Sequence, residues 1–235
     1  MLDDSVKQQI RSNLEAVRAM LAPHPEVKLL AAVKTVDVER IAYAVNECGV
    51  RYIGENRVNE LLEKYPYYPP SAELHFIGRL QTNKVKYIID KVSMIHSVDS
   101  LHLAAEIDKQ ASKRGLRMDV LAEINIACEE SKGGVQPSQA EEFVFALRNF
   151  GALRVRGLMA IPPVCADGED NARYFRAMRE IFLKINAKVI DTTGENVDNS
   201  IMDVLSMGMS GDYVSAAENG STMVRLGTAV FGRRS

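Results

Sequence analysis

Short apolar segments and helical segments alternate along the whole chain, and this alternation constrains the fold more than any other feature. Eight segments have the length and composition of strands buried on both faces, and each is followed by a turn. The predicted strands span residues 27–33, 51–53, 74–77, 94–98, 120–126, 155–161, 202–206 and 222–226. Strict alternation predicts a parallel sheet with helices outside it, and eight units favour a closed (β/α)8 TIM barrel over an open, doubly wound sheet.

Helical segments separate the predicted strands, and an extra one precedes the first. Within residues 3–22 the apolar side chains recur at spacings of three and four, which marks one face of a helix. The other predicted helices span residues 37–49, 58–65, 82–89, 101–113, 137–150, 171–185 and 213–219, and none is predicted after the last strand. We expect the polar stretch 187–201 to be a surface loop and residues 1–235 to form one domain.

The charge balance argues against several classes of protein. Lys and Arg total 29, Asp and Glu total 31, and the net charge is −2. A general nucleic-acid or anionic-membrane binder would carry a basic surplus. No apolar run approaches the roughly 18 residues of a membrane span, and the N-terminus has no signal-peptide core. Cys48, Cys128 and Cys165 are widely spaced, so we expect reduced thiols in a cytoplasmic protein.

Two stretches in the C-terminal part of the chain have the composition of a phosphate-binding cradle. Residues 205–212 and 224–228 each begin as an apolar strand and then change to glycine and hydroxyl residues. Main-chain N–H groups, Ser and Thr hydroxyls and a helix N-terminus can together bind one anion. In an eight-stranded barrel, the loops after the last two strands are the usual place for such a cradle.

Lys34 is the most informative single residue, because it ends the first predicted strand. Functional side chains of a barrel sit where strands end, and the other strand ends carry Asn56, His75, Ser97, Asn125, Met159, Ser206 and Arg225. Partial loss of water and a nearby cation would favour the neutral amine, which is a nucleophile for carbonyls. The alternative is a solvated lysine at a strand terminus. A lysine opposite a phosphate cradle suits an aldehyde-bearing phosphate ester, and pyridoxal 5′-phosphate is such a molecule.

Three further strand-end residues have two interpretations each. Arg225 inside a barrel needs either a ligand acceptor, such as a pyridine nitrogen, or an acidic residue in a buried salt bridge. His75 either stacks on a flat ligand or is a hydrogen-bonded core histidine. Asn56 is either a ligand contact or a helix cap, and the residues alone favour the cap. The sequence contains no metal-ligand spacing, no Ser-His-Asp pattern and no dinucleotide fingerprint.

Several motifs together resemble the pyridoxal phosphate homeostasis proteins. The motifs are residues 29–34, 52–56, 75–78 with 80–84, 156–159, 205–212, and 220–227 with 231–232. The resemblance covers about residues 5–234, and the combination of motifs is very specific. The chain departs from the family pattern at Val33, where members often have serine before the lysine.

The resemblance implies a fold-type III barrel similar to the N-terminal domain of alanine racemase, with pyridoxal 5′-phosphate as its cofactor. It implies that the cofactor forms an internal aldimine, a Schiff base, on Lys34. The same resemblance assigns the phosphate to Ser206, Ser210, Gly227 and Thr228, the ring nitrogen to Arg225, and the sides of the ring to Asn56 and His75. It implies no catalytic and no metal-binding residue.

Two functions from different classes fit this resemblance. The first is a carrier that buffers intracellular pyridoxal phosphate, a form of vitamin B6, and hands it transiently to apo-enzymes. The second is an amino-acid racemase or lyase of low activity that uses the same cofactor. A phosphate-sugar aldolase is disfavoured, because the strand ends offer no well-placed Glu or Tyr near Lys34.

The expected chain end and the expected cofactor contacts favour the carrier. Racemases similar to this barrel add a C-terminal β-domain, which supplies a catalytic tyrosine in their dimer, whereas this chain ends at Ser235, soon after the last strand. An arginine at the ring nitrogen would keep that nitrogen unprotonated and weaken the cofactor as an electron sink. We therefore expect a monomeric, cytoplasmic carrier rather than an enzyme.

Overall fold

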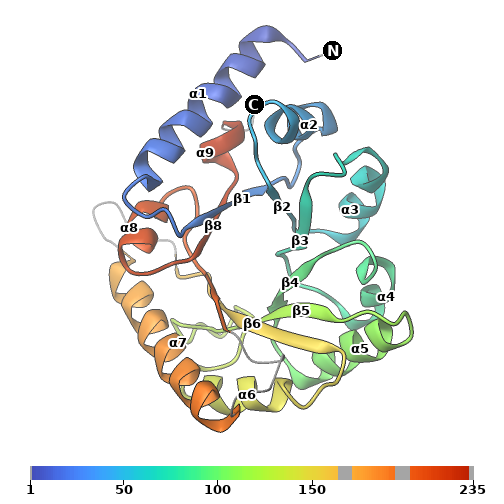
Figure 1. Ribbon diagram of the computed structural model, residues 1–235, viewed down its shortest axis with the longest axis vertical. Helices are drawn as coiled ribbons and strands as arrows, with labels where there is room; N and C mark the ends of the chain where they lie inside the picture. Colours follow the sequence, from blue (N-terminus) through green and yellow to red (C-terminus); the bar gives the residue numbers. More distant parts are fainter. Residues whose placement is uncertain (1, 164–170, 194–201, 233–235) are drawn as a thin grey trace.

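Eight parallel strands close into a barrel in the computed structural model, which describes residues 2–163, 171–193 and 202–232. Each strand pairs with the next in sequence, and the last pairs with the first (Figure 1). The strands are β1 (Lys28–Ala32), β2 (Tyr52–Glu55), β3 (Glu73–Phe76), β4 (Met94–Val98), β5 (Met118–Glu123), β6 (Leu153–Met159), β7 (Val204–Ser206) and β8 (Met223–Leu226). The predicted (β/α)8 TIM barrel is confirmed.

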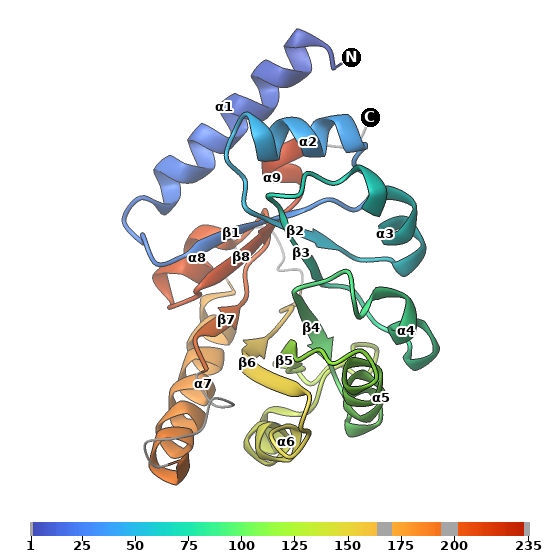
Figure 2. The ribbon, with the colours of Figure 1, turned by 45° about the vertical axis from the view of Figure 1, so that its right-hand side comes forward.

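Helices form a ring outside the strands (Figures 1 and 2). The α-helices after the strands are α2 (Val38–Asn46), α3 (Val58–Lys64), α4 (Val85–Ile88), α5 (Leu101–Ser112), α6 (Ala140–Leu147), α7 (Ala172–Thr193), α8 (Tyr213–Glu218) and α9 (Thr228–Phe231). The described residues also contain three short 3-10 turns, each directly adjoining a helix: η1 (Tyr65–Tyr67), η2 (Thr82–Lys84) and η3 (Pro137–Gln139). Two of the predicted helices, 82–89 and 137–150, therefore begin as 3-10 turns.

The extra N-terminal helix is α1 (Asp4–Leu21), and it is also confirmed. The Asp3 carboxylate accepts a hydrogen bond from the Ser5 N–H at 2.8 Å and so caps the helix. The apolar side chains spaced along one face are buried, namely Ile10, Leu14, Val17 and Leu21. This face packs against α2, α8 and α9 on the outside of the barrel (Figure 2).

Several element boundaries differ from the sequence prediction, and three of the differences bear on the site or on α7. Helix α7 continues to Thr193, so residues 187–193 are helical rather than part of a loop, and residues 194–201 lie outside the described chain. The helical spacing of buried Phe182, Ile185 and Val189 explains the extension. The last strand is followed by the one-turn helix α9. Strand β2 includes Gly54 and Glu55, which were expected in a turn, because both pair with β3.

Alternation along the strands divides the apolar residues into two clusters. Residues inside the barrel form a cluster of their own, namely Leu30, Ile77, Met94, Leu121, Met159, Val204 and Met223. The intervening strand residues pack outward against the helices. On β8, for example, Met223 belongs to the inner cluster, whereas Val224 and Leu226 belong to the outer one. A period of two therefore assigns every second strand position to the barrel interior.

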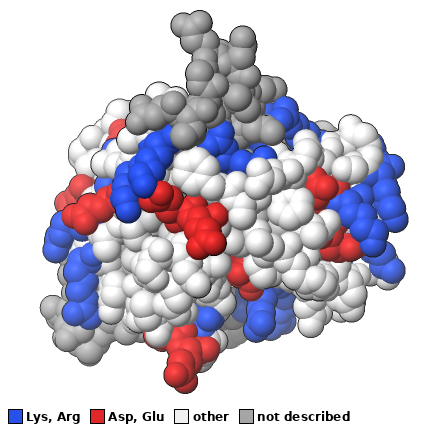
Figure 3. Space-filling model, turned by 90° about the horizontal axis from the view of Figure 1, so that it is seen from below, with Lys and Arg blue, Asp and Glu red and all other residues white. Residues whose placement is uncertain are grey.

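Charged side chains of both signs are interspersed on the face shown in Figure 3. None of the helices in the described residues is long and apolar enough to cross a membrane. Cys48 and Cys128 are free thiols, one buried and one exposed, while Cys165 lies outside the described residues.

Gly157 marks a point where the barrel tolerates no side chain. It lies at a shift in register between β5 and β6, with φ of 151°, and a Cβ built there would lie 1.8 Å from the Val204 carbonyl oxygen. Gly157→Ala should lower the free energy of unfolding by about 2–5 kcal/mol, measured by urea denaturation. The control is Gly151→Ala, where an added Cβ meets nothing within 4 Å. Equal stability of the two variants would contradict this prediction.

Candidate functional site

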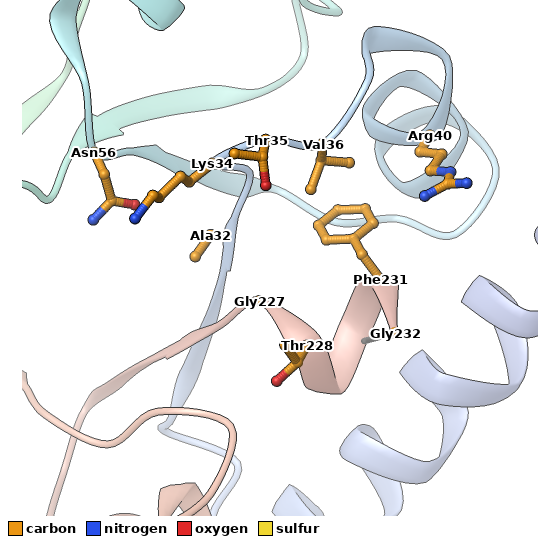
Figure 4. A pocket seen from close by; sticks show the side chains of 10 residues that line it. All are labelled: Ala32, Lys34, Thr35, Val36, Arg40, Asn56, Gly227, Thr228, Phe231 and Gly232. Atoms are coloured by element: carbon orange, nitrogen blue, oxygen red, sulfur yellow. The ribbon is translucent and has the colours of Figure 1, made fainter. Parts of the chain in front are cut away.

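The candidate site lies at the carboxyl ends of β8, β1 and β2, which are neighbours in the barrel. Lys34 follows β1 by two residues, Asn56 directly follows β2, and Gly227 directly follows β8. Together they line a cavity of about 360 Å³, whose walls are Ala32, Lys34, Thr35, Val36, Arg40, Asn56, Gly227, Thr228, Phe231 and Gly232 (Figure 4). The structure therefore brings four of the eight predicted cofactor ligands into one cavity: Lys34, Asn56, Gly227 and Thr228.

Lys34 and Asn56 extend side by side on one wall of the cavity (Figure 4). Among the described residues, the Lys34 amine has no hydrogen-bond or ion-pair partner. The backbone of Asn56 approaches Gly78 so closely that only glycine fits there, because a Cβ at Gly78 would lie 2.1 Å from the Asn56 carbonyl oxygen. The N-cap of α3 is Arg57, so the interpretation of Asn56 as the helix cap is wrong. Its side chain instead lines the cavity.

Thr228 and Ser210 lie at the start of α9. The Ser210 hydroxyl oxygen accepts hydrogen bonds from the main-chain N–H groups of Gly227 and Ala229, at 3.2 and 3.1 Å. Both lone pairs of that oxygen are then used, so its remaining polar capacity is the O–H, which can donate to an anion. The Thr228 hydroxyl lies in the cavity wall near this point. The hydroxyl groups and the helix start form the kind of cradle expected for a phosphate.

The other three predicted ligands form a buried polar row together with His96. Nδ1 of His75 lies 3.0 Å from Nε2 of His96, and Nδ1 of His96 lies 3.2 Å from the Ser206 hydroxyl oxygen. Arg225 donates to that oxygen at 2.7 Å and to the Ala160 carbonyl at 2.9 Å. The row crosses the barrel interior from β3 through β4 and β7 to β8. These two contacts are neither the ligand acceptor nor the buried salt bridge that the sequence analysis considered for Arg225.

Donor chemistry determines where the protons of this row lie. Arginine only donates, so the Ser206 oxygen is the acceptor towards Arg225. Among the described residues, His96 Nδ1 is the only acceptor within reach of the buried Ser206 hydroxyl. His96 Nδ1 is therefore unprotonated, and its Nε2–H donates to His75 Nδ1. By the same logic, His75 carries its proton on Nε2.

Burial keeps both imidazoles neutral. His75 is 2% exposed, and burial lowers its pKa to about 4, with Glu73 and Asp119 opposing the shift. Burial also lowers the pKa of His96 well below its ordinary value, and nearby His75 and Arg225 act in the same direction. The pKa of Arg225 falls to about 10 through burial, which still leaves the guanidinium charged at neutral pH.

Two residues of the interior were missed by the sequence analysis. His96 lies inside β4, and the strand-end rule selected its outward neighbour Ser97 instead. The period of two along a strand would have identified His96, because positions 94 and 96 share a face and Met94 belongs to the inner cluster. Glu123 ends β5, and its pKa is raised to about 7 by burial and by Asp99, with Arg225 and Arg79 opposing. A carboxyl that titrates near neutrality therefore lies at the β5 end of the barrel.

Two of the remaining strand-end candidates have structural roles, whereas the buried Ser97 hydroxyl has no hydrogen-bond partner among the described residues. Asn125 holds the loop that follows β5, because its amide donates to the Glu129 carbonyl at 2.8 Å and accepts from the Glu129 N–H at 3.0 Å. Met159 belongs to the inner apolar cluster. No group of three or more His, Cys, Asp or Glu side chains that could hold a metal ion is found in the described ranges.

The barrel and its lysine at the end of β1 define an alanine racemase-type barrel protein. The sequence model of the family described as "Alanine racemase, N-terminal domain" matches residues 6–235. Relatives named pyridoxal phosphate homeostasis protein share most of their length with this chain. That of Aquifex aeolicus is 45% identical, over 88% of this chain and 87% of its own, and that of Escherichia coli K12 is 35% identical, over 96% and 94%. The chain belongs to the pyridoxal phosphate homeostasis protein family, as the motifs predicted.

Solved structures agree with this assignment. PipY of Synechococcus elongatus, solved with pyridoxal phosphate bound, is 29% identical, with a TM-score of 0.82 over 95% of this chain and 100% of PipY. Alanine racemase of Corynebacterium glutamicum is 18% identical, with a TM-score of 0.72 over 95% of this chain and 60% of the racemase. The second likeness concerns the fold alone.

The buried histidines should make stability depend on pH. The unfolded chain binds the His75 proton near pH 6.5, whereas the folded protein binds it only near pH 4. Between these values the unfolded state holds more protons, so stability falls as the pH falls. From pH 6.5 to pH 5, His75 should account for a loss of about 2 kcal/mol in the free energy of unfolding.

Urea denaturation of the unaltered protein and of His75→Gln at both pH values isolates this contribution. Glutamine can still accept the hydrogen bond from His96 but does not titrate. The variant should lose less stability on acidification than the unaltered protein. Parallel losses in the two proteins would show that His75 is not held neutral by the fold.

Proposed function

We propose that this protein binds pyridoxal 5′-phosphate and serves in its homeostasis, as a carrier and buffer rather than as an enzyme. The observation that carries this proposal is the arrangement of the cavity at the ends of three adjacent strands: the Lys34 amine, which has no partner among the described residues, lines it together with Gly227 and Thr228. The family relatives named for this role, and PipY with its bound cofactor, support the same conclusion.

The polar groups of the cavity match the two ends of the cofactor. Thr228 and Ser210 suit the phosphate, because they offer hydroxyl donors at a helix start. Gly227 stays a predicted phosphate ligand, although its N–H donates to the Ser210 oxygen in this structure. The Lys34 amine suits the aldehyde. With the cofactor bound, the neutral Lys34 amine would be the group that captures the aldehyde carbon, and the carbonyl oxygen would leave as water with both amine hydrogens.

The remaining assignments concern the ring. Arg225 has five N–H groups, of which Ser206 and Ala160 engage two, so others remain to donate to a ring nitrogen. We assign Asn56 and His75 to the sides of the ring. Ser206 stays a predicted phosphate ligand, although its observed partners are Arg225 and His96.

The composition of the cavity wall supports a carrier over a racemase or lyase. Of the described residues that line the cavity, Lys34 is the only amine, and none is a carboxylate, imidazole, phenol or thiol. His75, which we assign to the side of the ring, lies outside this lining, and its Nδ1 is engaged by His96. A racemase needs a second group to exchange a proton on the opposite face of the cofactor. A donor-only guanidinium at the ring nitrogen would leave that nitrogen unprotonated. We further propose a single-domain monomer that works in the cytoplasm and transfers the cofactor transiently to apo-enzymes.

Removing the amine should separate the two anchor points. Lys34→Ala should abolish covalent attachment, measured by borohydride reduction and peptide mapping, but retain weaker binding through the phosphate in equilibrium dialysis. The control is Lys28→Ala, at the other end of β1. Borohydride should fix the cofactor to this variant as it does to the unaltered protein. Cofactor fixed to the Lys34→Ala protein would identify another lysine as the anchor.

Turnover separates the carrier from the enzyme. Incubation of the loaded protein with several amino acids, followed by chiral chromatography, should show racemisation and decarboxylation well below about 1 s⁻¹, an ordinary enzyme rate. The same protein should raise the activity of an apo pyridoxal phosphate enzyme mixed with it. Racemisation at ordinary enzyme rates would instead favour the racemase.

A further inference from the structure

An ion pair on α3 holds both peptide groups that flank Lys34. The Lys64 ammonium donates to the Val33 carbonyl at 2.9 Å, on the N-terminal side of Lys34. The Glu60 carboxylate accepts a hydrogen bond from the Thr35 N–H, on its C-terminal side. Lys64 and Glu60 are themselves joined at 2.6 Å, one helical turn apart. The two contacts fix the backbone on either side of the Lys34 Cα.

The held segment is a strained turn. The Val36 N–H donates to the Val33 carbonyl at 3.0 Å and closes a four-residue turn with Lys34 and Thr35 at its centre. Thr35 has φ of 61°, whereas Lys34 does not have a positive φ, which is the pattern of a type II turn. That third position normally takes glycine, and a β-branched threonine there is strained. Such a conformation persists only where the surroundings impose it, and the Glu60 contact does so.

The ion pair is embedded in a buried network rather than exposed on the surface. Lys64 is 12% exposed, and its third donated hydrogen bond goes to Glu55 at 3.1 Å. Glu55 is fully buried and also accepts from the Tyr68 hydroxyl at 2.7 Å. With Val33, Glu55 and Glu60 as acceptors, all three ammonium hydrogens of Lys64 are used. The ammonium is therefore held in one position, unlike a mobile surface lysine.

The turn that carries Lys34 lies between two cavities. Thr35, Val36 and Asn56 line both the cofactor cavity and a second cavity of about 740 Å³. Glu60 and Lys64 line only the second. They consequently contact the Lys34 turn from the side of the second cavity, and they would not touch a ligand in the first.

We propose that Lys64 and Glu60 are positioning residues, which aim the Lys34 amine at the aldehyde of the bound cofactor by fixing the turn from which it extends. The inference rests on the proposed function of Lys34. It predicts that the pair controls capture of the aldehyde and not binding of the phosphate and ring.

Two ligands separate these effects, namely pyridoxal 5′-phosphate and pyridoxine 5′-phosphate, which has the same ring and phosphate but no aldehyde. The amount of pyridoxal 5′-phosphate fixed by borohydride, measured over a range of concentrations, gives an equilibrium constant for capture of the aldehyde. In Lys64→Met this capture constant should fall about ten-fold or more, because a small misplacement of a reacting group is costly. The dissociation constant of pyridoxine 5′-phosphate, measured by calorimetry, should stay within about two-fold. Lys64→Arg should restore most of the capture, since a guanidinium can donate to the same acceptors.

The control is Lys109→Met, which removes an ion pair to Glu106 on the outer helix α5 and should change neither constant. If Lys64→Met does not fold, Glu60→Gln tests the same point, because it breaks the charge pair but keeps a side chain of the same shape. Unchanged capture in the folded variant, or a parallel loss of both ligands, would overturn the positioning role. Failure of the proposed function would show differently, as absence of fixed cofactor on Lys34 in the unaltered protein.

Discussion

The parallel pairing of β8 with β1 is the constraint on which the site depends. Leu30 pairs with Arg225 and Ala31 with Leu226, so the first and last strands end at the same edge. Lys34 and Thr228, almost two hundred residues apart in sequence, consequently line one cavity. An open sheet with the same strands would leave them on opposite margins. Barrel closure therefore brings together Lys34, the proposed carbonyl-reactive amine, and Thr228, a proposed phosphate ligand.

A charged guanidinium inside the barrel imposes the second constraint. Burial disfavours the charge of Arg225, and its pKa falls accordingly, yet each of its observed contacts is to a buried acceptor. A buried polar group is tolerable only when it is hydrogen-bonded. Ser206 meets this requirement for Arg225, and His96 and His75 extend the row to β3. The row places two neutral imidazoles next to a fixed cation in the barrel interior.

The sequence predicted most of the architecture because the relevant signals are local. Alternation of apolar segments identified all eight strands, and the spacing within residues 3–22 identified α1. The errors arose where tertiary pairing or packing overrides local signals. Gly54 and Glu55 look like a turn but continue β2 because β3 pairs with them. Polar residues obscured the last two turns of α7, although buried Val189 continues its apolar face.

The sequence by itself determined the eight-stranded barrel and the family. It also identified Lys34 and the segments after β7 and β8 as candidate ligand contacts. These features depend on neighbouring residues and their periodicity. Only the tertiary structure decided which of these residues meet. It placed Asn56 in the cavity rather than on a helix cap, put His96 in line with Arg225, and brought Lys64 against the Val33 carbonyl next to Lys34. The physical reason is that such contacts join side chains from different strands and helices, and their distances follow from barrel closure, register and packing, which no single segment specifies.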